Sequence, residues 1–283
     1  MGQTYARMGA PDPRLDMHGN LDIRLSSLFR AWAKADPPPQ RVKPLPLSVL
    51  AQVWATAHAL PTPLSVAAAE MLALGFLFLL RPGEYLGRPP PPPAHGPLFR
   101  VGDIQLWIGS RALDTFACAD AELLSATFVT LTFTEQKNGV RNETIGHGRS
   151  GHPHLCPVTV VAARLQFLRA AGADALTPLN AVRPTPGAPF RFILASDLTR
   201  RIRAAVTLHP DPAYAIADVS VRSTRAGGAM ALLCAGVDGD RLRMIGRWRS
   251  DEMYRYLHVQ AQPVMNGLAA AMLRGGNFRL TPS

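Results

Sequence analysis

Four short segments of the chain carry side chains that suit chemistry on a phosphate group. They cover residues 80–86 (LRPGEYL), 136–139 (QKNG), 222–229 (RSTRAGGA) and 245–257 (IGRWRSDEMYRYL). Arginine binds phosphate oxygens through parallel N–H bonds, lysine can give a proton to a departing oxygen, and tyrosine can act as a nucleophile. The side chains concerned are Arg81, Lys137, Arg222, Arg225, Arg247, Trp248 and Tyr256. Together they would suit the transfer of a phosphoryl group without a metal.

The order of these segments resembles that of the tyrosine recombinase family, which includes the phage integrases. Residues 80–86 are similar to the family's first box, in which an arginine at a helix end is followed three residues later by a glutamate. Residues 222–229 are similar to the second box. Residues 245–257 are similar to the closing pattern, in which the tyrosine follows a Gly-x-Trp element. A type IB topoisomerase shares the chemistry, but the Gly-Arg-Trp element and its distance from the tyrosine are closer to recombinases.

The resemblance implies a role for each candidate. Tyr256 would attack the scissile phosphate and form a 3′-phosphotyrosyl intermediate, while Arg81 and Arg225 would bind the phosphate oxygens, where negative charge develops. Lys137 would protonate the departing 5′-oxygen, which a guanidinium cannot do. The implied activity is site-specific DNA recombination or integration, as in a mobile element such as a transposon. The implied partner is double-stranded DNA, bound by a homo-oligomer, with no cofactor, metal or membrane.

Two positions depart from the family pattern. The histidine of the second box is replaced by Arg222, and the later histidine position holds Arg247 beside Trp248. Because arginine cannot exchange protons near neutral pH, acid or base help from residue 222 would be lost. Arg222, Arg247, Trp248 and a supporting Glu84 still belong to the predicted site. The alternative prediction is a catalytically impaired, domesticated DNA-binding protein on the same fold.

Several of these residues also have a simpler structural explanation. Arg81 can cap a helix C-terminus, Lys137 can be a solvated turn residue, and Trp248 can serve packing alone. Tyr254 competes with Tyr256 as the nucleophile, but the two would lie about 200° apart on a helix, so only one can face the phosphate. Spacing from the Gly-Arg-Trp element selects Tyr256.

The composition agrees with a polyanionic partner. The formal net charge is +10 at pH 7, and of 30 basic residues only Lys34, Lys43 and Lys137 are lysines. Cations that neutralise phosphates release counterions and so drive binding. A GC-rich genome also replaces lysine by arginine, so a helical interaction protein with incidental basicity is a further alternative. The predicted DNA-contacting residues outside the catalytic set are Arg41, Lys43, Arg141 and Arg149.

Cysteine and histidine usage favours neither disulfides nor metal. The three cysteines are far apart and form no CxxC pair, which is typical of reduced thiols in an intracellular protein. His147, His152, His154 and Cys156 lack the paired spacing of a structural zinc site. The chain opens without a signal-peptide pattern, and its longest apolar stretch, residues 71–80, is too short to span a bilayer. The predicted location is the nucleus of a eukaryote or otherwise the cytoplasm.

Helices and a few strands are predicted to position these residues. Helical periodicity predicts helices at residues 21–35, 47–60, 64–80, 157–171, 194–208, 225–235, 240–246, 250–259 and 264–273. Strands are predicted at residues 103–108, 127–134 and 142–145, with Asn138-Gly139 as a hairpin turn. The order of helices, small sheet and helices indicates an α+β fold: a mainly helical core with a small antiparallel β-sheet, as in a recombinase catalytic domain.

The predicted organisation has three parts. Residues 1–20 form a disordered N-terminus, and residues 21–45 form a remnant helix and basic proline-rich linker of a truncated core-binding domain. Residues 46–283 form the catalytic domain. Its last predicted helix is apolar on more than one face, so it can dock on a neighbouring protomer or pack within its own chain.

Overall fold

The computed structural model describes residues 8–35, 42–89, 98–136, 141–208, 214–248, 253–254, 257, 262–266 and 268–275. The chain divides into two compact units, Met1–Arg41 and Val42–Ser283. This division falls close to the position at which the sequence predicts the catalytic domain to begin. The proline run at residues 89–93 and the predicted helix at residues 250–259 lie largely outside the described residues.

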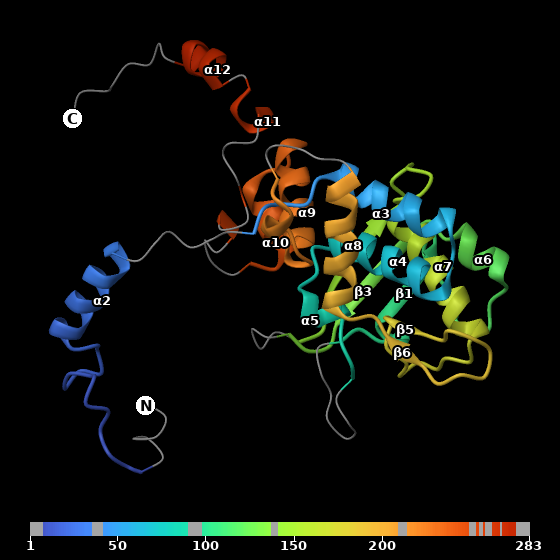
Figure 1. Ribbon diagram of the computed structural model, residues 1–283, viewed down its shortest axis with the longest axis horizontal. Coiled ribbons are helices and arrows are strands. Elements are labelled where there is room, and N and C mark those ends of the chain that lie inside the picture. The colour runs from blue at the N-terminus through green and yellow to red at the C-terminus, as the bar shows by residue number, and fades with distance from the viewer. Residues whose placement is uncertain are drawn as a thin grey trace. The chain divides into compact units, whose positions relative to one another are not determined.

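The described part of the first unit contains helix α2 (Ile23–Ala35), which the apolar periodicity predicts (Figure 1). The helix starts directly after Asp22 because this carboxylate accepts backbone N–H groups of the first turn, as an N-cap does. Residues 8–20, predicted to be disordered, form turns in which the side chains of Asp12 and Asp16 accept backbone N–H groups.

Helices dominate the second unit. They are α3 (Leu47–Ala59), α4 (Pro63–Leu77), α5 (Pro82–Tyr85), α6 (Asp120–Ser125), α7 (Pro157–Ala170), α8 (Ala195–Leu208), α9 (Arg222–Cys234), α10 (Gly239–Gly246), α11 (Gln262–Met265) and α12 (Leu268–Gly275), with 3-10 turns η1 (Val101–Asp103) and η2 (Ile216–Asp218). Helix α4 is central, because nearly all its residues after the first turn are apolar and buried. Helices α3, α7, α8 and α9 contact it.

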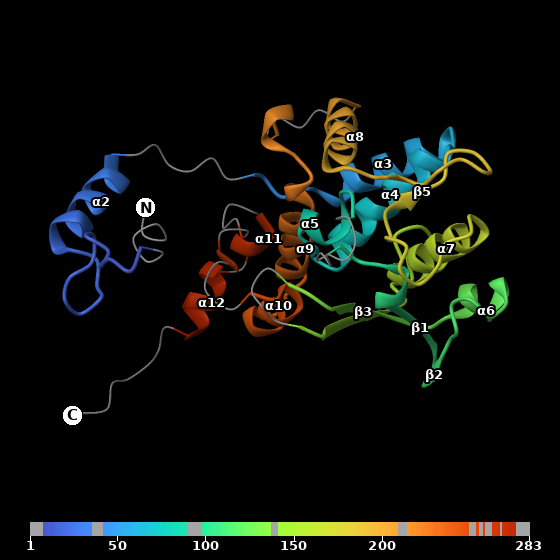
Figure 2. The same cartoon turned by 90° about the horizontal axis from the view of Figure 1, so that it is seen from below.

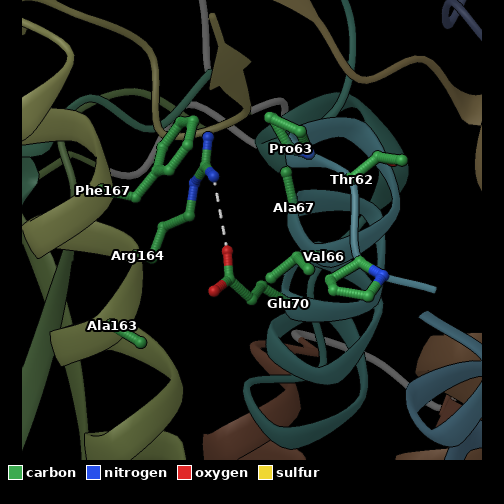
Figure 3. A pocket seen from close by; sticks show the side chains of 9 residues that line it. Thr62, Pro63, Val66, Ala67, Glu70, Ala163, Arg164 and Phe167 are labelled. Carbon is green, nitrogen blue, oxygen red and sulfur yellow. Dashed lines mark hydrogen bonds and ion pairs between the residues drawn. The ribbon is translucent and has the colours of Figure 1, made fainter. Parts of the chain in front are cut away.

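One charged pair is buried between α4 and α7. Arg164 of α7 points toward Glu70 of α4 beside a hollow of about 370 Å³ (Figure 3). Arg164 Nη1 lies 3.3 Å from Glu70 Oε2, and Arg164 Nε lies 2.9 Å from the carbonyl oxygen of Leu179. Nη2 donates to the carbonyl of Ala181. One guanidinium therefore ties α4 to α7 and to the segment around residues 179–181.

A four-stranded antiparallel sheet packs one face against the helices (Figure 2). Its order is β2 (Arg111–Ala112), β1 (Ile104–Ile108), β3 (Phe128–Phe133) and β4 (Glu143–Gly148). Buried and less buried residues alternate along β1 and β3, as expected when one face covers a core. Strands β5 (Ala181–Val182) and β6 (Arg191–Phe192) form a separate pair. The predicted mixture of helices with a small antiparallel sheet is confirmed.

The β3–β4 hairpin has a different register from the one that Asn138-Gly139 predicts. A two-residue turn there would place Phe133 opposite Thr144. The ladder instead pairs Phe133 with Glu143, and the Asn142 N–H donates to the Phe133 carbonyl over 2.8 Å. The pairing of the described strands therefore differs by one residue from the register that a two-residue turn alone would give. Residues 137–140 themselves lie outside the described part of the chain.

Two helices differ from their predicted bounds. Helix α9 begins at Arg222 and not at Arg225, because the Ser220 hydroxyl accepts the Arg222 N–H and the Ser223 hydroxyl accepts the Ser220 N–H. The single helix predicted at residues 264–273 is replaced by α11 and α12. The sequence between them is Asn-Gly, a pair that favours helix ends over helix interiors.

Candidate active site

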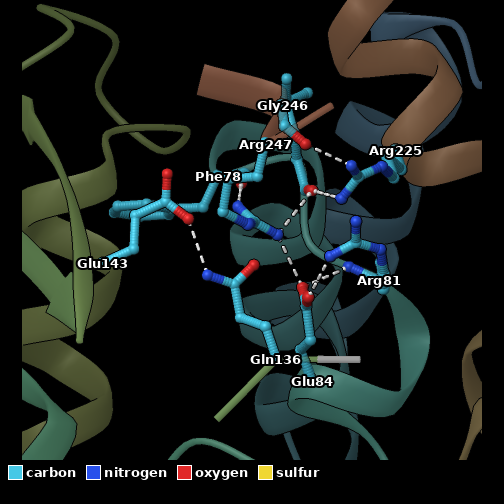
Figure 4. Close-up of polar contacts among 9 residues, drawn as sticks. Phe78, Arg81, Glu84, Gln136, Glu143, Arg225, Gly246 and Arg247 are labelled. Carbon is cyan, nitrogen blue, oxygen red and sulfur yellow. Dashed lines mark hydrogen bonds and ion pairs between the residues drawn. The ribbon is translucent and has the colours of Figure 1, made fainter. Parts of the chain in front are cut away.

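Three arginines from distant parts of the sequence lie close together, linked through the Glu84 carboxylate and the Leu79 carbonyl (Figure 4). Arg81 Nη1 lies 2.9 Å from Glu84 Oε1, and Arg247 Nη2 lies 2.7 Å from Glu84 Oε2. Arg225 and Arg247 both donate to the carbonyl oxygen of Leu79. We call Arg81, Arg225, Arg247 and Glu84 the arginine cluster. With three cations and one carboxylate, it has a net positive charge, so it is suited to bind an anion.

Arg81 and Glu84 are positioned by the short helix α5. Pro82 occupies its first position, and Glu84 Oε2 accepts the Arg81 backbone N–H over 2.7 Å, as the glutamate of a capping box does. Arg81 therefore precedes a helix N-terminus, and the alternative that it caps the C-terminus of the preceding helix was wrong. The Arg81 side chain is 29% exposed and that of Glu84 is 4% exposed. Arg81 is the cluster guanidinium that solvent reaches.

Leu79 holds the other two arginines together through its backbone. It has a φ of +49°, a left-handed conformation that costs a side-chain-bearing residue about 1–2 kcal/mol. This conformation ends α4 early, because the Leu80 N–H then reaches the Gly75 carbonyl over 3.0 Å, as in a Schellman motif. The Leu79 carbonyl thereby accepts from both Arg225 and Arg247.

Arg225 reaches the end of α4 because α9 packs very closely against it. A Cβ atom on Gly228 would lie 2.3 Å from the Phe76 carbonyl oxygen, so a side chain here would push the helices apart. Arg225 is buried, donates to the Gly246 carbonyl, and has its guanidinium carbon 4.5 Å from the centre of the Trp248 ring. The small residues of the second box thus have a packing role.

Gly228→Ala is expected to lower the free energy of unfolding by about 1–3 kcal/mol, because the added methyl group meets backbone atoms that cannot rotate away. Urea unfolding followed by circular dichroism measures this change. Gly83→Ala is the matched control, since no atom lies within 4 Å of the Cβ position at exposed Gly83. Equal stability of the two variants would contradict the close approach of α9 to α4.

Arg247 lies at the centre of the cluster. It ends α10 in a left-handed conformation with φ +55°, and its guanidinium carbon is 3.8 Å from the centre of the Phe133 ring. Burial lowers the pKa of Arg247 to about 10, an effect that Glu84 opposes and Arg81 reinforces. Arg247 therefore stays protonated at neutral pH and cannot replace a histidine in proton exchange.

The end of the β3–β4 hairpin contributes two residues that the sequence did not predict. Gln136 Nε2 donates to Glu143 Oε2 over 2.7 Å, and Figure 4 shows both side chains beside the arginine cluster. Gln136 is 4% exposed. Its position directly before Lys137 is visible in the sequence, but nothing in the sequence indicates that its side chain is buried. Lys137 lies outside the described residues.

Near the predicted nucleophile the structure describes Met253, Tyr254 and Leu257, and Tyr256 itself lies outside the described part of the chain. Met253 is buried in a small apolar group with Leu79 and Trp248, and the partly buried Leu257 packs against the same group. Leu79 and Trp248 also contact the buried arginines. Two neighbours of Tyr256 in the sequence therefore pack directly behind the cluster.

The remaining predicted residues are less central. Arg222 is exposed at the first position of α9, and Arg141 is exposed before β4. Lys43 Nζ lies 2.7 Å from Asp218 Oδ2. Arg149 donates to the carbonyls of Ala126 and Leu124 and so holds its loop to the end of α6. These contacts engage Lys43 and Arg149 within the chain, and Arg41 lies outside the described residues.

The histidines near the sheet have structural contacts. The ring of His147 packs edge-on against Phe78 at 4.6 Å, and burial lowers the pKa of His147. His152 Nδ1 accepts the backbone N–H groups of His154 and Leu155. In the described residues, no group of three His, Cys, Asp or Glu side chains is arranged to hold a metal ion.

Comparison with known proteins gives no match, either to a family model or to a curated protein. Within the described ranges, no helix combines the length and apolar character needed to cross a membrane.

Proposed function

We propose that the chain contains the catalytic unit of a tyrosine recombinase, which cuts and rejoins double-stranded DNA through a 3′-phosphotyrosyl intermediate. One observation carries this proposal: Arg81, Arg225 and Arg247 come from three of the segments that resemble the family, and two shared acceptors join them. Glu84 accepts from Arg81 and Arg247, and the Leu79 carbonyl accepts from Arg225 and Arg247. A chance resemblance would give no reason for residues so far apart in sequence to converge. The mixed fold with its small antiparallel sheet agrees with this proposal.

The charge of the cluster suits a phosphodiester. Arg81 is partly exposed, so it can contact a phosphate oxygen directly, while buried Arg225 and Arg247 raise the local positive potential. Such preorganised cations stabilise the additional negative charge of the transition state most strongly where water is excluded. Glu84 orients Arg81 and Arg247, and we assign it no part in bond making.

The bond changes would be those of a balanced exchange between two phosphodiesters. The Tyr256 oxygen forms a bond to phosphorus, its phenolic proton passes to solvent, and the bond from phosphorus to the 5′-oxygen breaks. Lys137 gives that oxygen a proton. Because the new linkage is also a phosphodiester, rejoining needs no energy source. The positions that hold histidine in the family are Arg222 and Arg247 here, so the proposed mechanism relies on Lys137 as its proton donor.

Covalent capture tests this function. Purified protein is mixed with nicked duplexes of randomised sequence, so that cleavage near the nick releases a short fragment and traps the enzyme on DNA. We expect an adduct that survives denaturing detergent and whose DNA, once sequenced, shares a common site. Absence of any adduct, with folding verified by circular dichroism, would contradict the proposal.

An impaired DNA-binding protein on the same fold is the second candidate, and the exposed Arg222 favours it. An arginine at the first position of α9 can contact phosphate but cannot exchange protons near neutral pH. This candidate predicts salt-dependent DNA binding without any adduct. Both candidates imply DNA as the partner, an oligomer assembled on it, and a cell compartment that contains DNA.

A further inference from the structure

The end of the β3–β4 hairpin is held by a side-chain contact across its loop. The ladder ends at the pair of Phe133 and Glu143, and the chain between them includes Lys137. The Gln136 amide turns back and donates to Glu143 Oε2 over 2.7 Å. Loop amides are mostly exposed, whereas Gln136 is among the buried polar residues of this chain. We call this hydrogen bond the Gln136–Glu143 clasp.

The clasp lies against the arginine cluster. Phe133 lies at the end of β3, and the guanidinium carbon of Arg247 is 3.8 Å from the centre of its ring. Glu143 also acts on Arg247 electrostatically, since its charge favours the protonated form. Figure 4 shows Gln136 between Glu143 on one side and Glu84 with Arg247 on the other. Phe133 thus contacts the cluster on one side of the loop, and Glu143 acts on it electrostatically from the other side.

The second polar atom of the Gln136 amide supports a role beyond packing. Its Oε1 is buried and, within the described residues, has no hydrogen-bond partner. Figure 4 shows this oxygen on the side of the amide away from Glu143, toward the cluster. A buried acceptor without a partner lowers stability, so a simple packing role would be served better by an apolar side chain.

We propose that Gln136 is a positioning residue, whose clasp to Glu143 fixes the hairpin end beside the arginine cluster and so sets the start of the segment that contains Lys137. The inference rests on the proposed function. Gln136 directly precedes Lys137, so the clasp restricts the backbone from which the lysine extends. Since Arg222 and Arg247 cannot exchange protons near neutral pH, protonation of the leaving oxygen depends on where this lysine is held.

A change of leaving group separates protonation from phosphate binding. The DNA site recovered by covalent capture is prepared with its normal bridging 5′-oxygen, and also with sulfur in place of that oxygen. A thiolate departs without a proton because thiols are far more acidic than alcohols, so a misplaced proton donor affects only the oxygen substrate. The measured quantity is the rate of adduct formation in a single turnover.

Gln136→Leu is expected to slow cleavage of the oxygen substrate by about 10²-fold while the sulfur substrate reacts at nearly the wild-type rate. Glu143→Ala breaks the clasp from its other side and should show the same selectivity. The swap Gln136→Glu with Glu143→Gln rebuilds the bond in the opposite direction and should restore the oxygen rate. Arg81→Ala, which removes a phosphate contact, should slow both substrates.

Equal slowing of both substrates by Gln136→Leu and Glu143→Ala would overturn the inference, because it would indicate general damage to the site. Unchanged rates on both substrates would overturn it as well. Rescue by the swap would show that the slow single variants are folded and lack only the hydrogen bond. Failure of Glu143→Gln to rescue Gln136→Glu would show that the hydrogen bond itself is unimportant. If wild-type protein forms no adduct with either substrate, the proposed function fails and the inference falls with it.

Discussion

Tyr256→Phe is expected to abolish the covalent adduct with DNA while leaving DNA binding intact. The substitution removes one oxygen atom and keeps the aromatic ring, so packing around residue 256 changes little. A covalent route has no substitute for its nucleophile, and loss of such a residue removes nearly all catalysis. The adduct is measured on denaturing gels with radiolabelled duplex from the capture experiment, and DNA affinity is measured by a mobility-shift titration at fixed salt.

Tyr254→Phe is the matched control, because it makes the same chemical change two residues away. Tyr254 is 57% exposed and its substitution should leave both adduct and binding unchanged. An adduct that persists in Tyr256→Phe and disappears in Tyr254→Phe would move the nucleophile to Tyr254. An adduct that persists in both variants would contradict the assignment of a tyrosine nucleophile to this segment.

Local sequence signals predicted the helices well and the finer features poorly. Helix α4 was predicted because a long apolar run follows the break that Pro61 and Pro63 make. Its end at Leu77 was not, because a left-handed Leu79 has no sequence signature of the kind that glycine provides. The two-residue strands β2, β5 and β6 are too short to show any alternation. The Asn-Gly pair predicted a hairpin between β3 and β4, but it could not decide which residues lie opposite each other.

The candidate site likewise has residues that the sequence predicts and contacts that it does not. The resemblance of three segments to the boxes of a known family predicted that Arg81, Arg225 and Arg247 belong to one site. The groups that hold them could not be predicted, since a backbone carbonyl such as that of Leu79 leaves no trace in the sequence. The burial of Gln136 is likewise a tertiary property, decided by what packs over the hairpin end.

Arg164→Met is expected to lower the free energy of unfolding by about 3–5 kcal/mol, the usual effect of removing one partner from a buried ion pair. The variant keeps an apolar side chain of similar length but leaves Glu70 buried without its cation. It also removes the donors to the carbonyls of Leu179 and Ala181. Urea unfolding at several pH values measures the change.

The loss should also depend on pH, with a sign that follows from Glu70. Burial already raises the pKa of Glu70, and Arg164 opposes that rise, so the variant should raise the pKa further. When the pKa of Glu70 is raised in the folded state, its buried charge destabilises the variant at pH values above those at which an unfolded glutamate titrates. Below those pH values Glu70 is protonated in both states and the destabilisation is gone. The difference from wild type should therefore shrink as the pH falls toward that range.

Arg200→Met makes the same chemical change at a surface ion pair and is the matched control. Arg200 Nη2 lies 2.6 Å from Asp197 Oδ1, but the Arg200 side chain is 76% exposed, so its removal should cost less than about 1 kcal/mol. The double variant Arg164→Met with Glu70→Leu should regain most of the lost stability, because it removes the uncompensated charge as well. If Arg164→Met costs no more than Arg200→Met at neutral pH, the Glu70–Arg164 pair does not hold α4 and α7 together as its burial indicates.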